Sequence, residues 1–242
     1  MEERQHVPHH IAIIMDGSGR WATARGLPRV LGHQAGAQAV RRVVEAACEL
    51  GVRALTLYTF SWENWERPTE EVQELMNLLH EFLQAELPQL RKQRIRLQAI
   101  GRLEMLPPSV LETLRRVTRE TASYDRMTLT LALSYGGRQE IADAARRLAE
   151  DVRRGILTPE QIDEARFAQA LSTVGMRDPD LLIRTSGEQR LSNFLLWQCS
   201  YTEWYLTPKL WPDFSKEDLA EAIAEYERRE RRFGRVGAAL AG

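Results

Sequence analysis

Residues 11–22 read IAIIMDGSGRWA, and this stretch is the first indication of the fold. Its apolar run at 11–15 ends in an aspartate and a glycine-rich turn. A continuous apolar run bounded by turn residues is typical of a strand that is buried on both faces of a parallel sheet. Runs of the same kind recur along the chain, at 54–60, 95–100, 127–133 and 181–183.

Helical patterns lie between these runs. Apolar residues recur at helical spacing from Val40 to Cys48, and Gly51 supplies a C-terminal stop. A second apolar stripe fills 72–83 after an acidic helix start at 69–71. We expect later helices to begin at Ser109, near Gly137, at Thr158 and at Ser215. Strands that alternate with helices predict a single α/β domain with a mostly parallel sheet, helices on both faces, and ligands beyond the carboxyl ends of the strands.

Composition limits the classes of protein to which the chain can belong. Its 242 residues and 43% hydrophobic content suit one domain over 1–242, with flexible tails expected at 1–8 and 236–242. Its 33 basic and 34 acidic residues leave a formal charge of -1, which argues against nucleic acid as a partner. No apolar run approaches the ~20 residues of a membrane span, so we expect a cytoplasmic protein. The adjacent histidines at 9–10 and the two separate cysteines lack the spacing of a metal site.

The turn after the first run has the composition of a phosphate site. Backbone N–H groups of Gly17 and Gly19 lie where a helix is expected to start, and such groups hold phosphates well. Asp16 directly before them would repel a phosphate unless a divalent cation lies between the two. We therefore interpret Asp16 as a magnesium ligand. The alternative is that Asp16 caps the following helix.

The same turn also fits a second, unrelated motif. Gly17, Gly19 and Ala22 have the spacing of a dinucleotide fingerprint, which normally needs an acidic residue at the end of the second strand. That strand closes with 60–62, which read FSW. A nucleotide-binding oxidoreductase therefore stays as an alternative supported only by glycine spacing.

Two more predicted strands are followed by loops that are rich in polar residues. The loop at 60–68 reads FSWENWERP, and the segment at 180–194 reads DLLIRTSGEQRLSNF. The planar forks of Arg184 and Arg190 match the geometry of phosphate oxygens. A single arginine after a strand is usually a solvated surface residue. Three such loops at one sheet edge instead predict an anion site.

Several segments together resemble the ordered motifs of one enzyme family. They are MDGSGRWA at 15–22, GHQAG at 32–36, FSWENWERP at 60–68, SYGGRQEI at 134–141, DLLIRTSGEQRLSNFLLWQ at 180–198 and YTEWY at 201–205. They are similar to the motifs of cis-prenyltransferases, and most similar to those of bacterial undecaprenyl diphosphate synthases. The resemblance spans nearly the whole chain. It implies a homodimer whose parallel six-stranded core holds an apolar tunnel.

The resemblance also implies roles for individual residues. Asp16 corresponds to a magnesium-linked aspartate, and Glu203 to a second carboxylate associated with magnesium. The allylic diphosphate would be held by Gly17, Ser18, Gly19, Arg20, Arg29 and His33, with Trp21 beside them. The clamp for isopentenyl diphosphate would consist of Arg184, Arg190, Leu191 and Ser192, with Arg67 nearby. The loop between the substrates would comprise Ser61, Trp62, Glu63, Asn64 and Trp65.

Two positions depart from the family pattern. The usual asparagine of the first motif is Ser18 here, and the usual asparagine before YGGR is Ser134. Serine keeps a hydrogen-bonding oxygen but lacks the reach of an amide and one donor group. Because Ser18 lies at the expected reaction centre, its presence puts the orientation of a diphosphate in question.

The implied activity is a magnesium-dependent condensation of isopentenyl diphosphate with an allylic diphosphate, farnesyl diphosphate being the expected starter. The product would be a long-chain polyprenyl diphosphate such as undecaprenyl diphosphate, the precursor of the cell-wall lipid carrier. Asn64 is the implied proton acceptor, although a diphosphate oxygen could serve instead. The stripe at 72–83 would line the tunnel, and ordinary core packing explains it equally well. Product release implies transient contact with the inner face of the membrane.

Two rival classes of protein share part of this pattern. One is a non-catalytic or weakly active homologue, and the presence of Asp16, Arg184, Arg190 and Ser192 argues against it. The second is a trans-prenyltransferase. Trans-prenyltransferases resemble all-helical bundles with DDxxD repeats, and this chain has neither feature.

Overall fold

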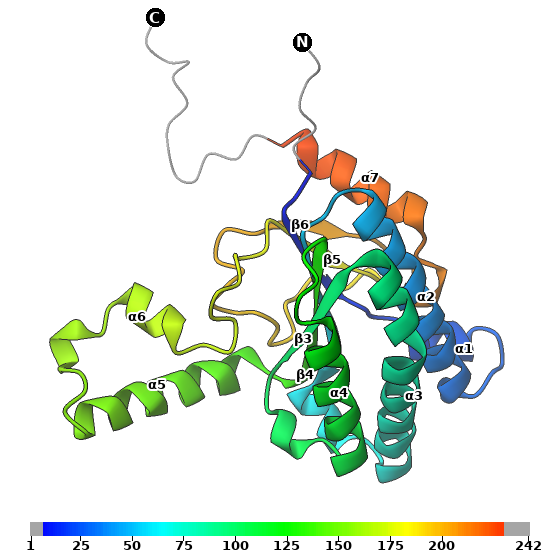
Figure 1. The fold of residues 1–242 in the computed structure, drawn as a ribbon. Coiled ribbons are helices and arrows are strands. Elements are labelled where there is room, and N and C mark those ends of the chain that lie inside the picture. The colour runs from blue at the N-terminus through cyan, green and yellow to red at the C-terminus, as the bar shows by residue number, and fades with distance from the viewer. Residues whose placement is uncertain (1–6, 230–242) are drawn as a thin grey trace, which may run out of the picture.

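A computed structural model describes residues 7–229 of the chain. Its centre is a six-stranded sheet in the order β3-β4-β2-β1-β5-β6, and all neighbouring strands are parallel (Figure 1). The strands are β1 (His10–Ile14), β2 (Ala54–Ser61), β3 (Ile95–Ile100), β4 (Met127–Tyr135), β5 (Leu181–Arg184) and β6 (Glu203–Leu206). The predicted parallel α/β sheet is therefore confirmed.

Helices connect the strands. They are α1 (Ser18–Thr23), α2 (Arg29–Glu49), α3 (Thr69–Gln93), α4 (Pro108–Thr121), α5 (Gly137–Arg153), α6 (Glu164–Gln169) and α7 (Lys216–Glu227). Short 3-10 turns lie at η1 (Trp62–Glu66), η2 (Leu103–Met105), η3 (Pro159–Gln161) and η4 (Trp211–Asp213). In Figure 1, α5 and α6 extend sideways from the body as an arm.

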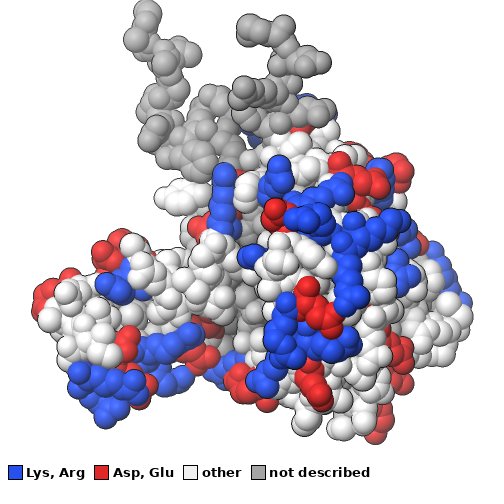
Figure 2. Space-filling view, in the orientation of Figure 1, with Lys and Arg blue, Asp and Glu red and all other residues white. Residues whose placement is uncertain are grey.

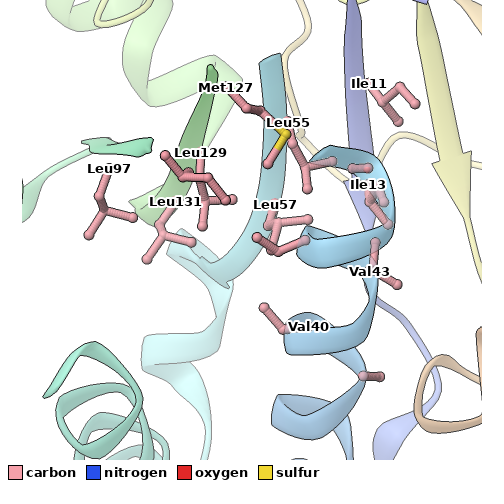
Figure 3. Packing of buried hydrophobic residues seen from close by; sticks show 14 of the residues in the cluster. Ile11, Ile13, Val40, Val43, Leu55, Leu57, Leu97, Met127, Leu129 and Leu131 are labelled. Carbon is pink, nitrogen blue, oxygen red and sulfur yellow. The ribbon is translucent and has the colours of Figure 1, made fainter. Parts of the chain in front are cut away.

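One face of the sheet carries the larger core. Ile11, Ile13, Leu55 and Leu57 alternate along β1 and β2, so their side chains point to the same face and pack under α2 (Figure 3). Each such fully buried side chain stabilises the fold by about 1.5–3 kcal/mol. Residues of α3, α4 and α7 complete this cluster.

The other face differs from the expectation of helices on both sides. Its buried cluster contains Phe194, Leu195 and Cys199, which belong to the irregular segment between β5 and β6. Tyr58 of β2 stacks on Phe194 with ring centroids 4.4 Å apart. A loop therefore covers much of this face, and its backbone is held close to the carboxyl ends of the central strands.

Some elements of the structure differ from those that the sequence predicted. Thr158 does form a capping box, but with the 3-10 turn η3 and not with an α-helix. The α-helix that follows, α6, is capped by Asp163, whose carboxylate accepts a hydrogen bond from the Arg166 N–H at 2.7 Å. Strand β6 was not predicted by any apolar run, because it is short and only partly buried.

The tails expected at 1–8 and 236–242 lie mostly outside the described residues. Of the described ones, Val7 packs against the core and Pro8 is buried. Across residues 7–229, no helix combines the length and apolar character that a membrane span requires. Acidic and basic side chains are interspersed over the face shown in Figure 2.

Candidate active site

The register of the sheet brings Asp16 and Arg184 together. Ile14 pairs with Arg184 across β1 and β5, and Asp16 follows Ile14 by two residues. Arg184 Nη2 donates to Asp16 Oδ2 at 2.9 Å. Arg184 Nη1 donates to Ser192 Oγ at 2.7 Å and to the Arg190 carbonyl oxygen. The guanidinium is 3% exposed, and its Nε finds no hydrogen-bond partner within residues 7–229.

The alternative that Asp16 caps a helix is wrong. The N-cap of α1 is Gly17, and the Asp16 carboxylate bonds to Arg184 instead. Partial burial of Asp16 opposes its ionisation, but Arg184 and then Arg20 outweigh burial and hold the pKa of the carboxyl below its usual value. Asp16 is therefore a charged group aimed at the site.

Glycine is required at the turn itself. Gly17 has a φ of 107°, and a Cβ there would lie 2.9 Å from the Leu210 side chain and 3.0 Å from Ser186 Cβ. Thr185 fixes the same turn, since its hydroxyl oxygen accepts from the Asp16 N–H at 2.9 Å. The position of the Asp16 carboxylate is thus set by backbone geometry.

A second charged cluster surrounds Glu71, in the first turn of α3. Its Oε1 lies 3.0 Å from Arg67 Nη1, 3.3 Å from Arg29 Nη2 and 3.5 Å from His33 Nε2. Burial raises the pKa of Glu71, but Arg29 and Arg67 outweigh it and the pKa is lowered overall. Glu71 was predicted only as part of an acidic helix start and not as a site residue. The i,i+4 spacing from Arg67 was the available signal.

His33 is the partly buried imidazole of this cluster, with a side chain that is 17% exposed. Burial first, and then the charge of Arg67, lower the pKa of His33, so the ring is neutral near pH 7. Within the described residues its Nε2 makes no hydrogen bond of good geometry, despite lying near Glu71. A buried ring nitrogen without a partner is available to a ligand.

Members of both clusters line one cavity of about 280 Å³. Its wall includes the predicted residues Asp16, Gly17, Ser18, Gly19, Arg20, Arg29, His33, Asn64 and Arg67. An apolar cavity of about 130 Å³ adjoins it and shares six lining residues with it: Met15, Ser18, His33, Tyr58, Thr59 and Leu75. The predicted stripe of α3 lines this second space with Leu75, Met76, Leu79 and Phe82. A cationic pocket therefore opens directly into an apolar one.

Other predicted residues of the loop at 60–68 support the site without lining the polar cavity. The Ser61 N–H donates to Asn64 Oδ1 at 3.0 Å, which holds the Asn64 amide. Trp65 Nε1 donates to Ser134 Oγ at 2.8 Å, and the Arg102 guanidinium lies 4.7 Å from the Trp62 ring centroid. Glu63 accepts from Asn193 Nδ2 at 2.8 Å. These contacts fix the loop to its neighbours.

Three further predicted residues lie outside the lining of the polar cavity: Trp21, Arg190 and Leu191. Trp21 Nε1 donates to Asp213 Oδ1 at 2.7 Å, and Arg190, whose side chain is 60% exposed, pairs with Glu188. Glu188 also lies 3.3 Å from Arg20, so it links Arg190 to the turn after β1. Leu191 packs against the second core cluster and so anchors the loop that presents Ser192.

Glu203 is not brought to this site within the chain. It is the first residue of β6 and pairs with Leu181, the first residue of β5, so it lies at the amino end of the strands. Its carboxylate is 3.0 Å from Arg229. Within the described part of the chain, no three His, Cys, Asp or Glu side chains form a metal-binding group. Within one chain, Glu203 and Asp16 therefore lie at opposite ends of the parallel strands.

A cationic cavity joined to an apolar one, at the carboxyl edge of an all-parallel six-stranded sheet, is the architecture of a cis-prenyltransferase. The family model "Putative undecaprenyl diphosphate synthase" matches residues 14–234, and the chain belongs to this family. The isoprenyl transferase of Geobacillus kaustophilus is 51% identical over 97% of this chain and 91% of its own.

Two solved structures are similar along nearly their whole length. Lavandulyl diphosphate synthase from Lavandula x intermedia, in complex with dimethylallyl diphosphate, has a TM-score of 0.92 and 42% identity, covering 94% of this chain and 98% of its own. A probable undecaprenyl diphosphate synthase from Campylobacter jejuni has a TM-score of 0.77 and 35% identity, covering 97% and 100%. The chain is therefore an enzyme of the cis-prenyltransferase class, and the oxidoreductase alternative is wrong.

Proposed function

We propose that this cis-prenyltransferase binds an allylic diphosphate, with farnesyl diphosphate as the starter, and extends it with isopentenyl diphosphate units to undecaprenyl diphosphate. The observation that carries the proposal is the junction of the two cavities. The side chains of Arg20, Arg29 and Arg67 line the polar cavity, and His33 Nε2, on the same wall, has no hydrogen-bond partner among the described residues. The adjoining apolar space suits a hydrocarbon tail.

The donor set fits Mg²⁺ as the cofactor. Asp16 is the only acid among the described residues that line the polar cavity. Mg²⁺ is usually held by one or two carboxylates together with substrate phosphates and waters. When bound, the ion would stabilise the departing diphosphate as a Lewis acid. Arg184 keeps Asp16 ionised and fixes its direction, which prepares this ligand before substrate arrives.

We assign the remaining roles from the residues themselves. Arg20, Arg29 and His33 would hold the allylic diphosphate, and Arg184, Arg190, Ser192 and Arg67 would hold isopentenyl diphosphate. Asn64 Oδ1 already accepts from the Ser61 N–H. We therefore propose that Asn64 orients the substrates and that a diphosphate oxygen accepts the proton.

We also propose a cytoplasmic homodimer that contacts the membrane surface transiently to release its product. Ile156 and Val174, near the two ends of the segment that carries α6, are 63% and 59% exposed, which favours a protein contact there. Leu27 and Leu31, beside the polar cavity, are 37% and 39% exposed and could meet a lipid surface. A role of Glu203 in metal binding would require the partner subunit.

The direct test supplies labelled isopentenyl diphosphate and farnesyl diphosphate, with and without Mg²⁺, and sizes the products. We expect Mg²⁺-dependent incorporation into long chains. A single condensation, or incorporation that ignores Mg²⁺, would contradict the proposal.

A further inference from the structure

The side-chain amide of Asn193 joins three segments of the chain. Its Nδ2 donates to Glu63 Oε1 at 2.8 Å and to Gln139 Oε1 at 3.0 Å. Its Oδ1 accepts from the Arg138 N–H at 2.8 Å. Glu63 belongs to η1, Gln139 to the first turn of α5, and Asn193 to the irregular segment between β5 and β6. Both donors and the acceptor of this amide are therefore used within the protein.

The backbone around the amide leaves room for it. A Cβ at Gly136 would lie 2.6 Å from Asn193 Nδ2 and closer still to Gln139 Oε1, so a side chain there would displace the contact. Asn193 has a φ of 63°, a left-handed conformation that asparagine and aspartate adopt more readily than most residues. Its carbonyl oxygen accepts from the Gly137 N–H at 2.7 Å. The start of α5 therefore holds the amide in one orientation.

Asn193 lies on a turn at 191–194 that is anchored to the sheet. Ser192 Oγ, on the same turn, accepts from Arg184 Nη1 at 2.7 Å. The Ser192 carbonyl oxygen accepts from the Tyr58 hydroxyl at 3.2 Å. The turn is therefore fixed to β5 through Arg184 and to β2 through Tyr58.

We propose that Asn193 is a positioning residue that holds the loop at 60–68 against the turn that carries Ser192. The inference rests on the proposed function, which assigns Ser192 to isopentenyl diphosphate and Asn64 to the orientation of the substrates. Asn64 lines the polar cavity, and its neighbour Glu63 is exposed. The bond from Asn193 to Glu63 therefore keeps the Asn64 amide at a set place relative to the anchored turn.

The physical reason is the entropy of the loop. A hydrogen bond to an exposed carboxylate contributes little to the stability of the fold, but it restricts where the loop can lie. A loop that is ordered before the reaction costs less entropy when the transition state forms. Loss of this bond should therefore affect turnover more than the stability of the protein.

The test is Asn193→Asp, which replaces the donor group of the amide by an oxygen. The carboxylate keeps an acceptor for the Arg138 N–H at the start of α5 and suits the left-handed backbone, so the turn should persist. It meets the Glu63 carboxylate with a like charge, which should release the loop. We expect turnover to fall about tenfold while the Michaelis constant for isopentenyl diphosphate stays within about threefold. A raised constant with unchanged turnover would show damage to the turn at 191–194 instead and would overturn the inference.

Gln139→Glu is the matched control. It makes the same change from amide to carboxylate beside Asn193, but its Oε1 remains an acceptor for Asn193 Nδ2. We expect turnover within about twofold of the native enzyme. An equal loss in N193D and Q139E would assign the effect to added negative charge near the diphosphates, which would overturn the inference.

A double variant tests the contact itself. Glu63→Gln supplies an amide that can donate to the carboxylate of N193D. Relative to E63Q alone, N193D/E63Q should therefore lose much less turnover than N193D loses relative to the native enzyme. Equal losses in the two backgrounds would mean that Asn193 does not act through Glu63, contrary to the inference.

Hydrogen exchange separates this inference from the proposed function, because it needs no substrate. In N193D the backbone amides of 61–67 should exchange faster, whereas those of α4 should not change. Should N193D fail to fold, Glu63→Ala removes the same contact from its exposed end, and we expect the same local increase. Unchanged exchange at 61–67 in the folded variant overturns this inference alone. A native enzyme that forms no polyprenyl product overturns the proposed function and leaves the exchange result intact.

Discussion

At the carboxyl ends of the strands the buried guanidinium of Arg184 keeps one nitrogen without a partner among the described residues, whereas at the amino ends both ring nitrogens of buried His10 are hydrogen-bonded. Arg184 is buried beside Asp16, yet its Nε has no partner within the described residues. At the other end, buried His10 donates from Nδ1 to the Arg177 carbonyl at 2.6 Å and accepts at Nε2 from Thr56 at 2.8 Å. Asp180 accepts from the His10 N–H at 3.1 Å.

This contrast distinguishes buried polar groups that belong to a binding site from buried polar groups that stabilise the fold. Buried polar groups in native proteins are normally satisfied, so the unpartnered Arg184 Nε beside the Asp16 turn is a candidate contact for a ligand. Groups such as the His10 ring, whose two nitrogens are both hydrogen-bonded within the protein, stabilise the fold and have no capacity left for a substrate. Substitutions at the two ends should therefore affect different properties of the enzyme.

The largest effect is expected for Asp16→Ala, which removes the proposed metal ligand. We expect turnover to fall at least ~100-fold, on the order of 3 kcal/mol of transition-state stabilisation. The fold should persist, because Arg184 keeps its bonds to Ser192 and to the Arg190 carbonyl. Steady-state kinetics and thermal unfolding check both parts, and a near-normal turnover would remove Asp16 from the mechanism.

Arg184→Ala should act mainly on binding. Loss of a charge-assisted contact is expected to raise the Michaelis constant for isopentenyl diphosphate about thirtyfold, on the order of 2 kcal/mol. Arg177→Ala is the matched control, since Arg177 also pairs with an aspartate, Asp180, at 3.1 Å, but at the amino end. If both variants change this constant equally, the contrast between the two ends is lost.

His10 should dominate the pH dependence of stability. Burial lowers the pKa of His10 from 6.5 to about 4, so the folded state binds fewer protons than the unfolded state between these values. Stability therefore falls as the pH falls, by about 2 kcal/mol from pH 7 to pH 5. The free energy of urea unfolding measures this loss.

Substitution of each neighbouring histidine isolates the contribution of His10. The pKa of His33 is lowered as well and acts in the same direction, so only the difference between proteins is informative. His10→Gln should flatten the dependence, whereas His9→Gln, at the exposed neighbour, should leave it unchanged. An equally steep dependence in His10→Gln would assign the effect to other groups.

The sequence predicted the elements of the sheet better than the contacts at its ends. Continuous apolar runs located five strands, because burial on both faces leaves a strong compositional pattern. β6 is short and half-buried, so no run marked it. The order and direction of strands depend on pairing between residues that are far apart in the sequence. The residues next to Glu203 in the chain therefore could not show that it lies at the amino end of β6.

The sequence predicted those site residues whose type alone restricts the chemistry that they can perform. Asp16, before a glycine turn, lines the cavity, and Arg184, at the end of β5, donates a hydrogen bond to Asp16. Glu71 was missed because an acid in the first turn of a helix is ordinary. Trp62, Asn64 and Trp65 lie on the same loop. Only the folded structure shows that Asn64 lines the cavity, whereas the two tryptophans support the loop.

Glu71 gives the smallest predicted effect and the sharpest test of how the cationic cluster works. Arg29 and His33 lie one turn apart on α2 and Arg67 precedes α3, and the Arg29 side chain is 58% exposed, so no strand register fixes them as it fixes Arg184. Without the shared carboxylate the two arginines would repel each other and separate. We expect Glu71→Ala to raise the Michaelis constant for a diphosphate about fivefold, on the order of 1 kcal/mol, with little change in turnover. Glu71→Gln keeps an acceptor and should show a smaller increase. If the alanine variant instead binds diphosphates more tightly, Glu71 competes with the substrate for these cations and does not position them.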